Sequence, residues 1–190
     1  MKLIDMTVTN FAKEVDSVSP APGGGSVAAL ASDIGVGLAR MMAHLSFGKK
    51  KYEALDEDIK KEFQSRFEKL GKIREELSKL VDEDTQSFNE FMKAVKMPKN
   101  TFKQITERQK ILSEATLNSI KVPYKTAYLS LEAMRELEFM VDNGNQNAIT
   151  DIGVGTLMLC TGLEGAILNV KVNLMSLEDK ELAKKYSESC

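Results

Sequence analysis

The sequence predicts an all-α protein, built as an up-and-down bundle of long helices. Apolar residues recur at three- and four-residue steps along most of the 190 positions, and no stretch shows the alternation typical of a half-buried strand. Two helical stretches rich in small residues, 26–47 and 147–173, are expected at the centre of the bundle. The length fits one domain over 1–190.

The N-terminal part predicts one short and one long helix. Residues 8–17 form a short amphipathic helix, and the loop 18–25 follows it. Ser26 is a good N-cap residue for the apolar helix 26–47, because its side-chain oxygen can accept from a backbone N–H of the first turn. Gly48 ends that helix.

A long helix over 54–96, ended by Pro98, carries an apolar seam interrupted by one carboxylate, Asp84. A carboxylate within such a seam is expected to have a partner or to lie at the edge of a cavity. Desolvation would raise its pKa and make it a proton carrier, whereas a salt bridge would make it structural, and both alternatives stay open. The seam consists of Leu77, Val81, Asp84, Phe88, Phe91 and Val95.

The second half predicts further helices. Residues 102–121 form one helix, which Pro123 either kinks or follows with a new helix. A turn at 142–145 precedes the apolar, glycine-rich helix 147–173, and a charged helix over 178–188 finishes the chain.

Composition and charge exclude several classes of protein. The net charge of −2 gives no support for a basic nucleic-acid-binding face. One histidine, His44, and two cysteines cannot form a multi-histidine metal site or a disulfide framework. Charged residues interrupt the apolar segments 27–47 and 148–170, and no signal peptide opens the chain. We therefore expect a cytoplasmic protein with no metal and no nucleic-acid or membrane partner.

The loop Ser19–Ser26 reads Ser-Pro-Ala-Pro-Gly-Gly-Gly-Ser and leads directly into an apolar helix. Free N–H groups at a helix N-terminus, next to glycines that allow close approach, favour an anion. This points to Gly23, Gly24, Gly25 and Ser26 as ligand-binding residues. A loop-to-helix junction with no ligand is the alternative, since no Gly-Lys-Ser/Thr follows.

Polar residues at the start of 147–173 form a second candidate site. Asn147 and Asp151 lie about 6 Å apart on one helix face, just after Asn145. Amides with one carboxylate can bind a polar heterocycle and stabilise a cation, although local capping is an alternative. Asn169 faces the same way roughly 27 Å further along. The two groups of polar residues could bind opposite ends of a long ligand, or they could belong to sites completed by another subunit.

The run Lys49, Lys50 and Lys51 is a third candidate. These lysines could hold a carboxylate or phosphate, or they could simply be solvated at a helix end. Helix 26–47 would separate them from the glycine loop by about 30 Å.

Several blocks occur together and in order: Ser19-Pro-Ala-Pro-Gly-Gly-Gly-Ser26, Gly48-Lys-Lys-Lys-Tyr52, the stretch from Asp84 to Pro98-Lys99, Val122-Pro123, Asn145-x-Asn147 with Asp151-x-Gly153-Val154, and Leu168-Asn169-Val170. Together they resemble the cyclodeaminase/cyclohydrolase family of folate enzymes, which includes the C-terminal part of formiminotransferase-cyclodeaminase. The resemblance covers nearly the whole chain.

The resemblance implies an all-helical, dimer-forming domain acting on tetrahydrofolate one-carbon derivatives. The expected activity is that of a formiminotetrahydrofolate cyclodeaminase, which converts 5-formiminotetrahydrofolate to 5,10-methenyltetrahydrofolate and releases ammonia. A methenyltetrahydrofolate cyclohydrolase on the same scaffold is the alternative, and a non-catalytic folate-binding or helical assembly protein is a third. The expected partners are the folate substrate and a second copy of the chain, with no cofactor.

On this reading Asp151 is the first catalytic carboxylate and Asp84 is the reserve acid or base. Asn145 and Asn147 orient the pterin, and Asn169 also binds substrate. The glutamate tail is assigned to Gly23, Gly24, Gly25, Ser26, Lys49, Lys50 and Lys51.

Overall fold

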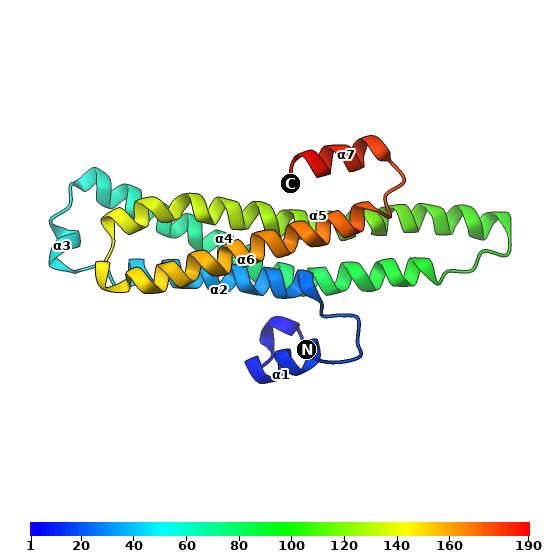
Figure 1. The fold of residues 1–190 in the computed structure, drawn as a ribbon, viewed down its shortest axis with the longest axis horizontal. Helices are drawn as coiled ribbons and strands as arrows, with labels where there is room; N and C mark the ends of the chain where they lie inside the picture. The colour runs from blue at the N-terminus through cyan, green and yellow to red at the C-terminus, as the bar shows by residue number, and fades with distance from the viewer.

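The computed structural model describes residues 1–190, and its centre is a bundle of four long helices in which consecutive helices run antiparallel (Figure 1). The prediction of an all-α, up-and-down bundle is confirmed. The α4–α5 hairpin extends well beyond the ends of α2 and α6 (Figure 1). The elements are η1 (Leu3–Asp5), α1 (Val8–Val15), α2 (Gly24–His44), α3 (Lys50–Glu53), α4 (Glu57–Val95), α5 (Phe102–Asn143), η2 (Gln146–Ala148), α6 (Ile149–Leu174) and α7 (Lys180–Glu188).

The start of α2 differs from the sequence prediction. Gly23 is the N-cap residue and the helix begins at Gly24, so the prediction that Ser26 caps it is wrong. Ser26 is instead fully buried in the first turn, where its hydroxyl lies 3.2 Å from Oδ2 of Asp84 and 3.1 Å from Oγ1 of Thr85. The hydroxyl is used between helices rather than for capping.

Helix α5 runs without interruption through Pro123, so this proline does not start a new helix. Proline has no N–H, which leaves the carbonyl of Ser119, four residues earlier, without its helical donor. Nδ2 of Asn173 on α6 donates to that carbonyl at 2.6 Å. A side chain of the neighbouring helix thus replaces the missing backbone hydrogen bond.

Helix α2 forms the centre of the bundle, where it packs against α4, α5 and α6. A Cβ atom added to Gly35 would lie 2.7 Å from the carbonyl oxygen of Gly155, and one added to Gly155 would lie 2.8 Å from that of Gly35. These glycines let α2 and α6 approach closely. The largest fully buried side chains include Met42, Phe63, Leu70, Leu77 and Leu80.

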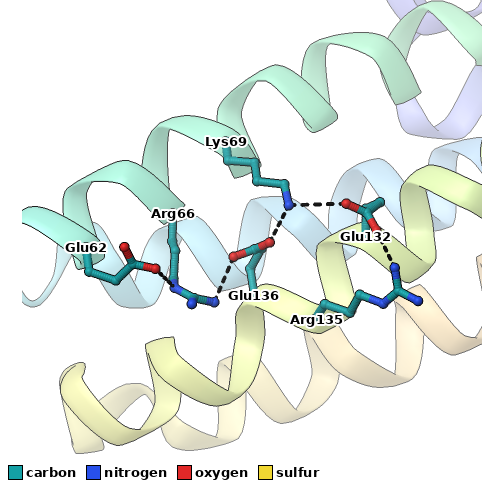
Figure 2. Close-up of polar contacts among 6 residues, drawn as sticks. All are labelled: Glu62, Arg66, Lys69, Glu132, Arg135 and Glu136. Carbon is teal, nitrogen blue, oxygen red and sulfur yellow. Dashed lines mark hydrogen bonds and ion pairs between the residues drawn. The ribbon is translucent and has the colours of Figure 1, made fainter. Parts of the chain in front are cut away.

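An ion-pair network joins α4 and α5 on one side of the bundle. Figure 2 shows Glu136 of α5 between Arg66 and Lys69 of α4, at 2.9 and 2.5 Å. The Glu136 side chain is only 8% exposed, and Glu132 extends the network through Lys69 and Arg135. The two cations offset the cost of burying the Glu136 carboxylate.

Two helical segments, α2 and Gln146–Leu174, are long and apolar enough to cross a membrane by length and composition alone. The apolar window of α2 is 61% buried, as expected for a core helix, whereas that of Gln146–Leu174 is only 28% buried. The exposed side chains Val154, Leu157, Leu168 and Val172 lie on one side of α6. We call this surface the α6 face.

Candidate active site

A cavity of about 370 Å³ lies where the N-terminus of α2 meets α4, α5 and α6. This volume falls near the lower end of the range of roughly 300–1,000 Å³ found for small-molecule sites. Its lining is largely polar and includes Gly23, Gly24, Gly25, Asp84, Ser87, Ser119, Asn169, Asn173 and Ser176, with Phe88 and Phe91 as its aromatic side chains. We call it the polar cavity.

Asp84 is the acidic group of the polar cavity. Its carboxylate accepts hydrogen bonds from the hydroxyl and the backbone N–H of Ser26. Burial raises the pKa of Asp84 above its ordinary value of 3.8, because desolvation outweighs these two hydrogen bonds. No salt bridge to Asp84 is formed. Of the two roles left open for this residue, the geometry favours the proton carrier.

Gly25 makes room for this carboxylate. A Cβ atom at Gly25 would overlap the carboxyl group of Asp84, so the close approach requires glycine at this position. The anion beside the N-terminus of α2 is therefore the protein's own Asp84. The assignment of Gly23, Gly24, Gly25 and Ser26 to a glutamate tail stays a prediction, and that tail would compete with Asp84 for the same donors.

Two amides of α6 complete the polar cavity. Nδ2 of Asn169 donates to the carbonyl of Gly165 at 2.8 Å, and Nδ2 of Asn173 donates to Ser119 as described above. Both NH₂ groups therefore have partners within the protein, which leaves both amide oxygens as acceptors for N–H groups of a ligand.

The lysine run lies at the opposite end of α2, about 30 Å from the glycine loop by helix geometry. Lys49 and Lys51 line a crevice of about 40 Å³ together with Asn145, while Lys50 is exposed. The crevice is far smaller than a small-molecule site. The amide of Asn145 is engaged locally: its Nδ2 donates to the carbonyl of Leu45, and its Oδ1 accepts from the backbone N–H of Asn147.

Asp151 lies in the first turn of α6, half-buried, and the side chain of Asn147 precedes it on the surface. Since α6 is one continuous helix, eighteen residues separate Asp151 from Asn169 by about 27 Å. The folded chain therefore brings Asp84, the glycines and Asn169 together, and leaves Asp151, Asn145 and Asn147 at the other end of the bundle.

Comparison with known proteins agrees with this architecture. The family model described as formiminotransferase-cyclodeaminase matches residues 7–190. The chain belongs to this family. The methenyltetrahydrofolate cyclohydrolase of Methylorubrum extorquens is 33% identical over 179 residues, which cover 94% of this chain and 84% of that protein.

Formimidoyltransferase-cyclodeaminases are similar over one part of their length. Those of Mus musculus and Dictyostelium discoideum are 31% and 35% identical over 96% and 98% of this chain, which spans about a third of their length. The crystal structure of formiminotetrahydrofolate cyclodeaminase from Thermotoga maritima superimposes with a TM-score of 0.83 at 24% identity. The superposition covers 99% of this chain and 89% of the Thermotoga maritima chain, and it shows that the two share a fold.

Within this family fold, the sequence reasoning assigned no site role to Ser87, Phe88, Phe91 or Ser119, all of which line the polar cavity. The two phenylalanines belong to the same seam as Asp84, so the seam itself carried the available signal: side chains next to a carboxylate in an apolar seam share its surroundings. The signal for Ser119 lay four residues later, because Pro123 has no N–H and leaves the Ser119 carbonyl without its helical donor.

Proposed function

We propose that this chain is a formiminotetrahydrofolate cyclodeaminase that works in the polar cavity. Membership of a family of folate one-carbon enzymes supports the substrate class. The observation that carries the proposal is Asp84: a half-buried carboxyl with a raised pKa, beside two free amide acceptors, in a cavity large enough for a small heterocycle.

The chemistry needs one proton acceptor and one proton donor. N10 of the folate attacks the carbon of the protonated, positively charged formimino group and loses its proton, and the bond from that carbon to the departing nitrogen then breaks. A protonated nitrogen leaves as ammonia, and the 5,10-methenyl bridge keeps the positive charge. A carboxyl with a raised pKa can accept the first proton, return it to the leaving group, and then stabilise the cation as carboxylate.

In this proposal the amide oxygens of Asn169 and Asn173, which line the polar cavity, accept from N–H groups of the reduced pterin. The glycine loop supplies a wall without bulky side chains, so that the heterocycle can approach Asp84 closely. The proposed reaction consists of proton transfers and bond rearrangement, so we expect turnover to be unchanged after dialysis against a metal chelator.

We further propose that the working unit is a homodimer formed through the α6 face. Its side chains include Val154, Leu157, Leu168 and Val172, and burying them removes apolar surface from water. Antiparallel pairing about a twofold axis near the middle of α6 brings the partner subunit's Asp151 within about one helical turn of the level of Asn169. Asp151 and Asn169 lie on the same side of the helix, so the two predicted groups combine in one shared site.

The dimer is tested by light scattering on matched variants. Val154→Asp places a charge on the α6 face and should give a monomer with little activity. Val8→Asp places the same charge on α1, where Val8 is 88% exposed, and should leave both properties unchanged. A wild-type protein that is monomeric and fully active, or one that partitions into lipid vesicles through this face, would contradict the proposal.

The shared site is tested by mixing two inactive variants, Asp84→Asn and Asp151→Asn. If each site takes Asp84 from one subunit and Asp151 from the other, a mixed dimer has one intact site. Random re-association should then restore about a quarter of wild-type activity. Wild-type turnover by Asp151→Asn alone would remove Asp151 from the mechanism.

The activity itself is tested with purified protein and 5-formiminotetrahydrofolate. Ammonia should be released while the methenyl absorbance rises, and Asp84→Asn should abolish both signals. The second candidate is methenyltetrahydrofolate cyclohydrolase, favoured by the Methylorubrum extorquens relative that this chain covers over 84% of its length. Decay of supplied methenyltetrahydrofolate faster than the spontaneous rate, with no ammonia release from the formimino compound, would support it.

A further inference from the structure

A second cavity, of about 480 Å³, opens next to the polar cavity between α4, α5 and the segment that joins α6 to α7. Phe91 of α4 and Ser176 after α6 line both cavities, so the two are continuous at this junction. We call the second one the apolar groove.

The two cavities differ in chemistry. The polar cavity has a carboxylate and two amides, whereas the exposed lining of the apolar groove is mainly that of leucine and valine side chains from three parts of the chain, with Gln109, Ser113 and Thr116 among its polar lining residues. Val95 comes from α4, Leu112 and Leu117 come from α5, and Leu177 and Leu182 come from the C-terminal segment. A ligand that fills both is expected to have a polar end joined to a more apolar part.

The C-terminal segment is held firmly enough to serve as a wall. Leu177 is buried against Ile120 and Val170, and Leu182 packs on the same cluster. Tyr186 makes an edge-to-face contact with Tyr124 of α5, with ring centroids 5.1 Å apart. These contacts fix α7 over the groove.

We propose that the apolar groove binds the aminobenzoyl ring of the folate whose pterin occupies the polar cavity. This inference rests on the proposed function. The junction at Phe91 is where a pterin and a benzoyl ring would meet, and aromatic rings pack favourably in offset or edge-to-face arrangements. Glu178 and Asp179 also line the groove, and their negative charges disfavour the carboxylates of the ligand's glutamate there. We therefore expect this glutamate to lie towards solvent.

The test compares two ligands on the whole protein: 5-formyltetrahydrofolate, which has the aminobenzoyl ring, and 6-methyltetrahydropterin, which lacks it. Leu112→Ser removes a half-buried side chain from the groove and should weaken folate binding by about tenfold or more, with unchanged pterin affinity. Leu117→Ser provides a second variant should the first be unstable. The matched control is Ile111→Ser, which removes a similar side chain that lines neither cavity.

The outcomes separate the two proposals. If the wild-type protein binds both ligands and the groove variants bind both as tightly as wild type, the groove inference is wrong and the proposed function stands. If the wild-type protein binds neither ligand, both fail. Equal losses for folate and pterin in the groove variants would also overturn the inference, since they indicate a general disturbance of the site.

Discussion

Replacing Asp84 by asparagine separates catalysis from folding in this protein. Asparagine has nearly the same shape and keeps an oxygen that can accept from the hydroxyl of Ser26, which lies 3.2 Å from the native carboxylate. It cannot carry a proton or a negative charge. The substitution therefore removes the proposed chemistry while it preserves the packing between α2 and α4.

The expected loss of activity is large. General acid–base catalysis by one positioned side chain contributes about 10²- to 10⁴-fold, equivalent to roughly 3–5 kcal/mol of activation free energy. Stabilisation of the methenyl cation by the same carboxylate would add to this loss. We therefore expect kcat of Asp84→Asn to fall by at least about a hundredfold, with a smaller change in KM.

The same substitution should lower activity but raise the free energy of unfolding. The pKa of Asp84 is raised in the folded state by desolvation, so between 3.8 and that raised pKa the folded protein binds more protons than the unfolded chain. The free energy of unfolding therefore falls as pH rises through this window. At a pH above the raised pKa, the free energy of unfolding is lower by about 1.4 kcal/mol for each unit by which folding raises the pKa of Asp84. Asparagine does not titrate, so the variant should gain stability over wild type as pH rises.

Urea denaturation of both proteins at pH 4, 6 and 8, together with methenyl absorbance assays at neutral pH, checks both parts. The stability difference should be near zero at pH 4 and should favour the variant at pH 8. A variant with wild-type kcat would refute the catalytic role. A variant less stable than wild type at pH 8 would refute the reasoning that partial burial of the Asp84 carboxylate costs folding free energy.

Two further predictions concern stability. Asn173→Ala should lower the free energy of unfolding by about 1 kcal/mol, because the carbonyl of Ser119 loses its donor. Adding Pro123→Ala should recover most of that loss by restoring the helical N–H, which a double-mutant cycle measures. Glu136→Gln should cost about 1–2 kcal/mol in urea denaturation, because two cations lose a largely buried charge. Glu132→Gln, at the more exposed edge, should cost less than about 1 kcal/mol.

The helices were predictable because their signals are local. Apolar spacing and the small residues of 26–47 and 147–173 identified the long helices, and the central contact of Gly35 with Gly155 agrees with that interpretation. The cap of α2 was wrong by three residues, since serine competes with glycine for this position and Ser26 had a stronger use between helices. Capping preferences depend on neighbouring residues alone, so they take no account of the hydrogen bond between Ser26 and helix α4.

The site was predictable only in part because its members are far apart in sequence. The glycine loop predicted a helix N-terminus suited to an anionic ligand, which stays a prediction, but that the Asp84 carboxylate lies beside this N-terminus depends on how α4 packs on α2. Asp84 lies 58 residues after Ser26, and only the folded chain brings the two together. The one sequence signal for this contact was a carboxylate in an apolar seam, which marks a residue that requires a special environment without identifying its partner.

The length of α6 constrains every mechanism that uses both predicted carboxylates. Asn169 lines the polar cavity and Asp151 lies about 27 Å away on the same rigid helix, a separation that side-chain motion cannot close. Either Asp84 performs the proton transfers alone, or Asp151 reaches the cavity from a second subunit. The apolar, largely exposed α6 face favours the second alternative, because the pairing that covers this face also reverses the helix end to end. Covering the face and completing the site would then be a single event, and loss of the dimer should remove activity without unfolding the bundle.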